Sequence, residues 1–113
     1  MPKYDAGTVM WAQDPPNAHD ERPVIILSHK TRPFNSVECT VMCLGHGSQR
    51  QNHSTPELES HHLQGISFSK APYVMPWAIY SIAPATLQQA RAVGELTQDG
   101  KRLVQKELVK LLG

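Results

Sequence analysis

The chain has 113 residues. This length suits one compact domain, 1–113, and excludes a multidomain protein, since domains usually run to about 100–150 residues. Hydrophobic residues make up 40% and charged residues 19%, a balance that excludes a disordered tail or a coiled coil. Eleven Lys and Arg against ten Asp and Glu give a formal net charge of +1, which excludes a nucleic-acid binder that works through bulk charge.

The first residues and the two cysteines bear on the cellular compartment. No stretch approaches the about 18–20 apolar residues that span a bilayer, and residues 1–5 lack the apolar core of a secretory signal. Four strand residues separate the Cα atoms of Cys39 and Cys43 by about 13 Å, beyond the limit of about 7 Å for a disulfide. We expect a cytoplasmic protein with two buried thiols and no membrane contact.

Three strands are expected in the first half of the chain. Residues 7–12 are rich in β-formers and run into a Pro-rich loop that extends to Glu21. Residues 23–28 form an almost uninterrupted β-branched run, which indicates a strand buried on both faces with Pro23 at its start. Residues 37–44 alternate, and we expect their apolar set to occupy one face.

The second half begins with a long loop and ends in a helix. Residues 45–69 hold four histidines and little periodicity, with one short strand expected around 63–68. Residues 73–82 return to strand composition, and Pro76 implies an edge or a bulge. A helical turn or loop at 83–92 and a last strand at 93–96 precede a helix capped by Thr97 or Asp99, whose apolar stripe is Leu103, Val104, Leu108, Leu111 and Leu112.

Five or six short strands and one C-terminal helix predict a mainly β (α+β) fold. The expected architecture is a small, strongly curved antiparallel barrel with the helix packed on it. Parallel α/β folds are excluded, because no helices alternate with the strands.

Several short motifs follow one another in the order and approximate spacing of a known family. They are Gly7-Thr8-Val9-Met10-Trp11, Asp14-Pro15, the segment 21–28 with its Arg22-Pro23 pair, the strand at 73–82, and Gly94-Glu95-Leu96 before the final helix. In these segments the chain resembles the MazF/PemK toxins of toxin–antitoxin systems.

The resemblance implies a fold, an activity and partners. The fold is an SH3-like antiparallel barrel of about five to seven strands with a C-terminal helix, assembled as a homodimer. The activity is that of a type II toxin: a metal-independent endoribonuclease, without a cofactor, that cuts single-stranded RNA at short sequence motifs. The RNA's 2′-hydroxyl is the nucleophile, and the products carry a 2′,3′-cyclic phosphate and a 5′-hydroxyl. An acidic cognate antitoxin folds onto such a toxin and blocks its RNA groove.

This chemistry needs a base, an acid and a cation over the phosphorane. By resemblance Arg22 serves the phosphate, where its guanidinium fork suits two oxygens, and Glu21 is a candidate base. His46 and Ser48 follow the third strand and are candidates for proton transfer or positioning of the 2′-hydroxyl. Candidates for RNA contact are His19, Arg32, Arg50 and Trp77.

The chain departs from the family pattern at three places. The Gly-Ser-Glu of the family's first loop is replaced by Asn17-Ala18-His19-Asp20-Glu21, which makes the loop a few residues shorter. The hydroxyl that the family carries at the end of the third strand aligns with Leu44 or Gly45, and the Asp-Gln pair of its inner strand is replaced by Trp77-Ala78. Two alternatives therefore remain. One is a catalytically inactive member that binds protein or nucleic acid, and the other is a gyrase-directed toxin of the same barrel type that acts through its C-terminal helix.

The four histidines of residues 45–69 do not predict a metal site. Their spacing fits neither the His-x-x-x-His pattern of a helical zinc site nor a Cys-paired finger, because both cysteines lie upstream on a strand.

Overall fold

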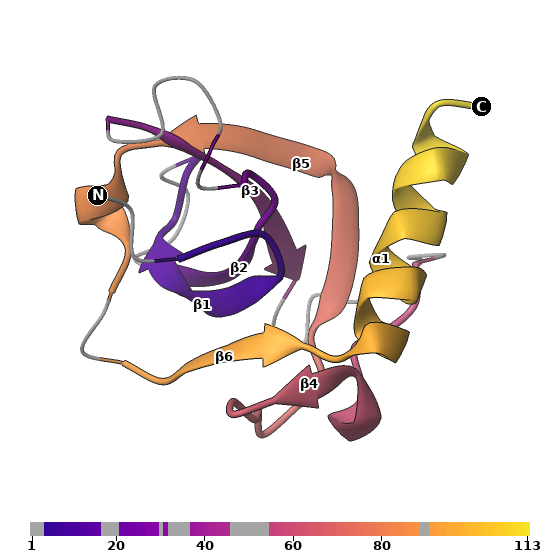
Figure 1. Ribbon diagram of the computed structural model, residues 1–113. Coiled ribbons are helices and arrows are strands. Elements are labelled where there is room, and N and C mark those ends of the chain that lie inside the picture. The colour runs from indigo at the N-terminus through magenta and orange to yellow at the C-terminus, as the bar shows by residue number, and fades with distance from the viewer. Residues whose placement is uncertain (1–3, 17–20, 30, 32–36, 46–54, 89–90) are drawn as a thin grey trace.

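The computed structural model describes residues 4–16, 21–29, 31, 37–45, 55–88 and 91–113. Within these ranges the chain forms one curved antiparallel sheet in the order β4-β6-β1-β2-β3-β5, with a helix beside it (Figure 1). The sheet is not closed, since β4 and β5 are its two edges. In chain order the elements are β1 (Thr8–Gln13), β2 (Glu21–Ile26), β3 (Cys39–Gly45), the 3-10 turn η1 (Ser60–His62), β4 (Leu63–Gln64), β5 (Tyr73–Ile82), the 3-10 turn η2 (Pro84–Thr86), β6 (Val93–Leu96) and α1 (Gln98–Leu111).

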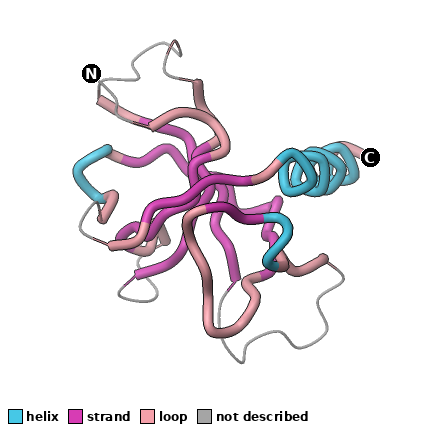
Figure 2. The backbone as a smooth tube through the Cα atoms, turned by 60° about the horizontal axis from the view of Figure 1, so that its bottom comes forward, coloured by secondary structure: helices cyan, strands magenta, loops and turns pink. Residues whose placement is uncertain are grey.

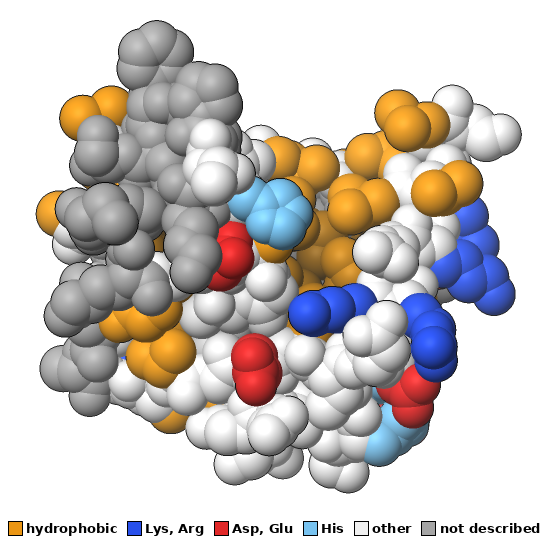
Figure 3. All heavy atoms as spheres, in the orientation of Figure 1, with side chains coloured by type: hydrophobic (Ala, Val, Ile, Leu, Met, Phe, Trp, Pro, Cys, Tyr) orange, Lys and Arg blue, Asp and Glu red, His pale blue; other side chains and the backbone are white. Residues whose placement is uncertain are grey.

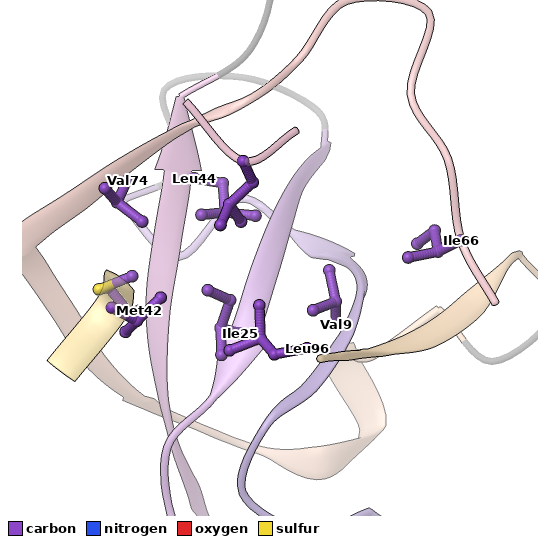
Figure 4. Close-up of a cluster of buried hydrophobic side chains, with 9 residues drawn as sticks. Val9, Ile25, Met42, Leu44, Ile66, Val74 and Leu96 are labelled. Carbon is purple, nitrogen blue, oxygen red and sulfur yellow. The ribbon is translucent and has the colours of Figure 1, made fainter. Parts of the chain in front are cut away.

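Both faces of the central strands are buried. Because side chains alternate across a strand, each strand supplies two separate cores. What we call the helix-side core includes Val104 of α1 and is drawn in Figure 4; its members are Val9, Ile25, Met42, Leu44, Leu58, Ile66, Val74, Leu96 and Val104. The second core lies on the other face and consists of Met10, Ala12, Val24, Ile26, Cys39, Val41, Cys43, Ala78 and Leu87.

This arrangement confirms the expected two-sided burial of β2 and corrects the expectation for β3. Met42 and Leu44 lie in the helix-side core while Cys39, Val41 and Cys43 lie in the second, so apolar residues occupy both faces of β3 and not one. The reason is that α1 and the segment before β5 cover the face that the alternation had assigned to solvent. Both cysteines are buried thiols outside any disulfide, as expected.

β5 has the bounds expected from its composition, and Pro76 lies where a missing N–H is tolerated. β5 is an edge strand, and its pairing register with β3 shifts between Met42 and Leu44. Pro76 lies opposite this bulge, and Figure 1 shows β5 bending sharply along its length. The expected strand near 63–68 is shorter, since β4 spans only Leu63–Gln64, whereas β6 spans the expected residues.

The helix α1 begins as expected at a threonine cap. The Thr97 hydroxyl accepts the Gly100 N–H at 3.2 Å. Leu103, Val104 and Leu108 pack on the helix-side core, but Leu112 at the end of the stripe is 91% exposed. Figure 2 shows α1 standing to one side of the sheet. In the described ranges, no helix is both long and apolar enough to cross a membrane.

Candidate functional site

Arg22 projects from β2 into a small polar cluster, which we call the Arg22 cluster: Arg22, Asp14, Leu44 and Met75. Its Nε donates to Asp14 Oδ1 at 2.8 Å, and its Nη1 donates to the Leu44 carbonyl at 3.1 Å. The Met75 sulfur lies 3.9 Å from the same Nη1. The Arg22 side chain is 15% exposed and the Asp14 side chain 0%. The cluster therefore connects β2, β3 and β5 with the residue that follows β1. One part of the Arg22 guanidinium stays open to solvent.

The Arg-Pro dipeptide explains why the Leu44 carbonyl is free to accept a side chain. The pairing of β2 with β3 runs from Ile26↔Val41 to Val24↔Cys43, and the next pair in this register would be Pro23 and Leu44. Proline has no N–H to donate to a ladder. Pro23 thus lies inside β2, paired with Trp11 of β1, and not at the start of the strand as the sequence suggested. The guanidinium of Arg22 takes the place of the missing donor.

Cys43 is a buried neighbour of the Arg22 cluster. Burial raises the pKa of its thiol to about 11; Arg22 lowers that pKa and Asp14 raises it. The thiol is therefore protonated at neutral pH, and only the thiolate is a good nucleophile. Cys43 accordingly carries no chemistry here and acts as a small apolar group.

Glu21, the expected base, lies on the other side of β2 from Arg22. Successive strand residues point to opposite faces, and the Glu21 carboxylate pairs with Arg91, seventy residues away along the chain. The Arg91 guanidinium also lies 3.9 Å above the Trp11 ring, which in turn contacts Phe68 with ring centroids 5.8 Å apart. The structure does not bring Glu21 and Arg22 together on one phosphate. Arg91 is a solvent-accessible cation that sequence reasoning missed, because no local pattern links residues 21 and 91.

The end of β3 has no room for the hydroxyl group of the family pattern. Leu44 is fully buried in the helix-side core. At Gly45 an added Cβ would lie 1.9 Å from Cζ of Tyr73, because the Tyr73 ring packs directly on this glycine. Core packing around Leu44 and Gly45 thus explains why this chain lacks the hydroxyl residue that the family carries at the end of its third strand.

Most other candidates fall on residues that the structure does not describe. His19, Arg32, His46, Ser48 and Arg50 all lie outside the described residues. Trp77 is described: it lies on β5 and is 51% exposed, which suits a surface contact better than a core position.

Two of the remaining histidines join η1 to α1. His62 is 8% exposed; its Nδ1 accepts the Glu59 N–H at 2.9 Å, and its ring centroid lies 3.9 Å from that of His61. Its carbonyl accepts the Thr97 N–H at 2.9 Å. Among the residues that the structure describes, no three His, Cys, Asp or Glu side chains are grouped so as to hold a metal ion.

Stability is expected to fall in weak acid because of His62. Burial is the main cause that lowers the His62 pKa below its usual 6.5, and His61 adds to it while Glu59 and Asp99 oppose it. As pH falls, His62 is therefore protonated in the unfolded chain at a higher pH than in the folded chain. The free energy of unfolding declines as pH falls below about 6.5 and levels off below the folded-state pKa of His62. His62→Asn retains an acceptor near Nδ1 and is expected to flatten the urea-unfolding profile below about pH 6.5. An identical profile in the variant would contradict this assignment.

A groove separates α1 from the end of β2. Its cavity volume is about 410 Å³, and its floor includes Ile25, Leu96, Val104 and Leu108. Figure 3 shows hydrophobic side chains gathered between the sheet and the helix, with basic groups at the rim. Lys101 is one of the lining residues. The groove thus combines an apolar floor with positive charge.

Comparison with known proteins supports the fold. No family model matches the chain, and no curated protein sequence matches it. Among solved structures, a chain in the crystal structure of MazE-MazF (Form-II) from Deinococcus radiodurans is 18% identical, with a TM-score of 0.66 over 97% of this chain and 95% of that chain. The expected mainly β fold is confirmed: the protein has the fold of this chain of the MazE-MazF structure.

Proposed function

We propose that the protein is the toxin of a type II toxin–antitoxin system and cleaves single-stranded RNA without a metal ion. The observation that carries this proposal is Arg22: a cation held by Asp14 and Leu44 at the end of a central strand, in a fold shared with a chain of a MazE-MazF structure. The resemblance of the Arg22-Pro23 segment to MazF/PemK sequences supports the same reading. Fold alone does not fix an activity, so the proposal depends on the site.

Arg22 is the group that we assign to the scissile phosphate. In the cleavage step the 2′-oxygen attacks phosphorus and loses its proton to a base. The bond from phosphorus to the 5′-oxygen breaks, and an acid protonates that oxygen, which leaves a 2′,3′-cyclic phosphate and a 5′-hydroxyl. Negative charge on the phosphate oxygens grows in the transition state, and a fixed guanidinium beside them lowers the barrier.

The two proton transfers are assigned to the residues that follow β3. His46 and Ser48 are the candidates, because they follow β3 in the sequence and β3 carries the Leu44 carbonyl that Arg22 contacts. Glu21 remains a candidate base only if RNA displaces Arg91 from its carboxylate. Trp77, His19, Arg32 and Arg50 are proposed to contact the RNA chain.

Cleavage of a long single-stranded RNA in EDTA by the purified protein is the direct test. We expect fragments with 5′-hydroxyl ends, which a polynucleotide kinase labels without prior phosphatase treatment. Arg22→Lys keeps a cation beside Asp14 but loses the planar fork, so cleavage is expected to slow by about 100-fold or more.

Arg102→Lys is the matched control. The same change at an exposed helix position, where Arg102 pairs with Asp99, is expected to leave the rate unchanged. Uncut RNA with the folded wild-type protein would reject the enzyme, as would equal rates for Arg22→Lys and the wild type.

A non-catalytic RNA- or protein-binding module is the second candidate. It is favoured by the end of β3, where Leu44 is buried and the Tyr73 ring fills the space beside Gly45. RNA that is retained in a gel-shift assay but stays intact would select this candidate.

We further propose a homodimer and an acidic antitoxin as partners. Apolar side chains remain exposed on β5 and α1: Trp77, Ile79, Val109, Leu111 and Leu112. An exposed apolar set of this kind is typical of an interaction surface. The groove lined by Lys101 and Leu108 suits an acidic chain with apolar residues, which is the chemistry of the proposed antitoxin.

Leu112→Lys is expected to weaken dimerisation by at least about tenfold, or about 1.4 kcal/mol. Leu112 is 91% exposed in the single chain, so a lysine at this position would not disturb the fold of the chain. Its charge would have to be buried at a dimer interface that contains residue 112, and this would oppose dimerisation. Analytical ultracentrifugation over a dilution series measures the change, with Lys110→Ala as the control. A wild-type protein that stays monomeric at high concentration would disprove the dimer.

A further inference from the structure

Asp14 is a fully buried carboxylate. Its side chain is 0% exposed at the end of β1, and its Oδ1 lies 2.8 Å from Arg22 Nε. Aspartate is seldom fully buried unless it is paired. In the sequence Asp14-Pro15 is one of the motifs of the family resemblance, without a role of its own, and nothing in the proposed cleavage chemistry uses Asp14 directly.

The contacts of Arg22 divide its guanidinium into a held part and an open part. Nε is held by Asp14, and Nη1 by the Leu44 carbonyl and the Met75 sulfur. In the part of the chain that the structure describes, Nη2 has no hydrogen-bond partner. A guanidinium has five N–H donors, so two anchors leave donors for an anion on the remaining edge.

We propose that Asp14 is a positioning residue for RNA cleavage: it fixes the Arg22 guanidinium so that Nη2 faces a phosphodiester. This inference rests on the proposed function. An arginine side chain carries about 2 kcal/mol of rotamer entropy, and an unanchored guanidinium would have to lose it as the reaction proceeds. A carboxylate that already holds Nε removes that reorganisation from the chemical step.

Two substitutions separate positioning from simple structural support. Asp14→Ala removes the acceptor for Nε, whereas Asp14→Asn keeps an oxygen at the same place without the charge. We expect Asp14→Ala to lower kcat by about 100-fold with KM changed less than about threefold, since the lost interaction belongs to the transition state. Asp14→Asn is expected to recover kcat to within about tenfold of the wild type.

Activity is measured at a temperature where circular dichroism shows every variant folded. If Asp14 only supports the fold, kcat per folded molecule stays at the wild-type value in both variants, and that result overturns the proposal. Equal losses in the two variants overturn it as well, because orientation would then not depend on the hydrogen bond.

A second readout does not require activity. The Arg22 Nε–H, assigned through Arg22→Lys, is expected to give a slowly exchanging signal in ¹⁵N NMR spectra of the wild type and Asp14→Asn, and to lose protection by at least about tenfold in Asp14→Ala. Unchanged protection in Asp14→Ala would show that Asp14 does not orient Arg22. If the wild type cuts no RNA but protection depends on Asp14, the proposed function fails while the orienting contact stands, so the two failures are distinguishable.

Discussion

Replacing Arg22 with alanine is expected to lower the free energy of unfolding by about 3–5 kcal/mol. The change leaves the Asp14 carboxylate, which is 0% exposed, without its 2.8 Å ion pair. Removing one partner of a buried ion pair costs more than the net stabilisation that the intact pair provides. Urea unfolding at neutral pH, followed by circular dichroism, measures the loss.

The double variant Asp14→Ala/Arg22→Ala is the informative control. It removes the charge together with its partner, so it is expected to be more stable than Arg22→Ala alone, although smaller side chains then leave a cavity. A loss below about 1 kcal/mol for Arg22→Ala would show that Asp14 is solvated or paired well enough without Arg22. This coupling also makes Arg22→Ala a poor test of catalysis, which is why Arg22→Lys is preferred there.

Gly45→Ala is expected to cost about 3 kcal/mol or more, at the upper end of overpacking effects. The added Cβ would lie 1.9 Å from Cζ of Tyr73, and the Tyr73 ring is itself buried. Thermal and urea unfolding both report the change.

A matched glycine and a partner variant check this interpretation. Gly113→Ala adds a methyl group where no atom lies within 4 Å, and its effect is expected to stay within about 0.5 kcal/mol. In a Tyr73→Ala background, Gly45→Ala is expected to cost less than in the wild type. Equal costs in the two backgrounds would mean that the ring does not cause the strain.

Residue patterns within a single segment predicted the strands and the helix whose position does not depend on distant parts of the chain. β5 and β6 have the expected bounds, and α1 begins at the expected threonine cap. β2 contains the expected β-branched run but begins at Glu21, and Leu112 at the end of the stripe of α1 is exposed. Two features were wrong because they depend on distant segments. Pro23 lies within β2 since β1 extends alongside it, and β3 is buried on both faces since α1 covers one of them.

The candidate site was predictable only in part, for the same reason. The Arg22-Pro23 motif indicated the cation but not its partners, because Asp14, Leu44 and Met75 come from three other parts of the chain. The pairing of Glu21 with Arg91 has no sequence signal at all. Sequence adjacency suggested that Glu21 and Arg22 would act together, whereas the alternation of side chains along a strand separates them.

The central place of β2 has a consequence for the proposed contact between Arg22 and RNA. β2 has a paired strand on each side, and Val24, Ile25 and Ile26 are almost entirely buried. Amide protons in such a strand exchange only when the whole domain unfolds, so we expect the backbone beneath Arg22 to be among the slowest to take up deuterium. Under the proposed function, a phosphate would meet a guanidinium carried on a rigid backbone, and the RNA strand would supply the bending that the contact requires.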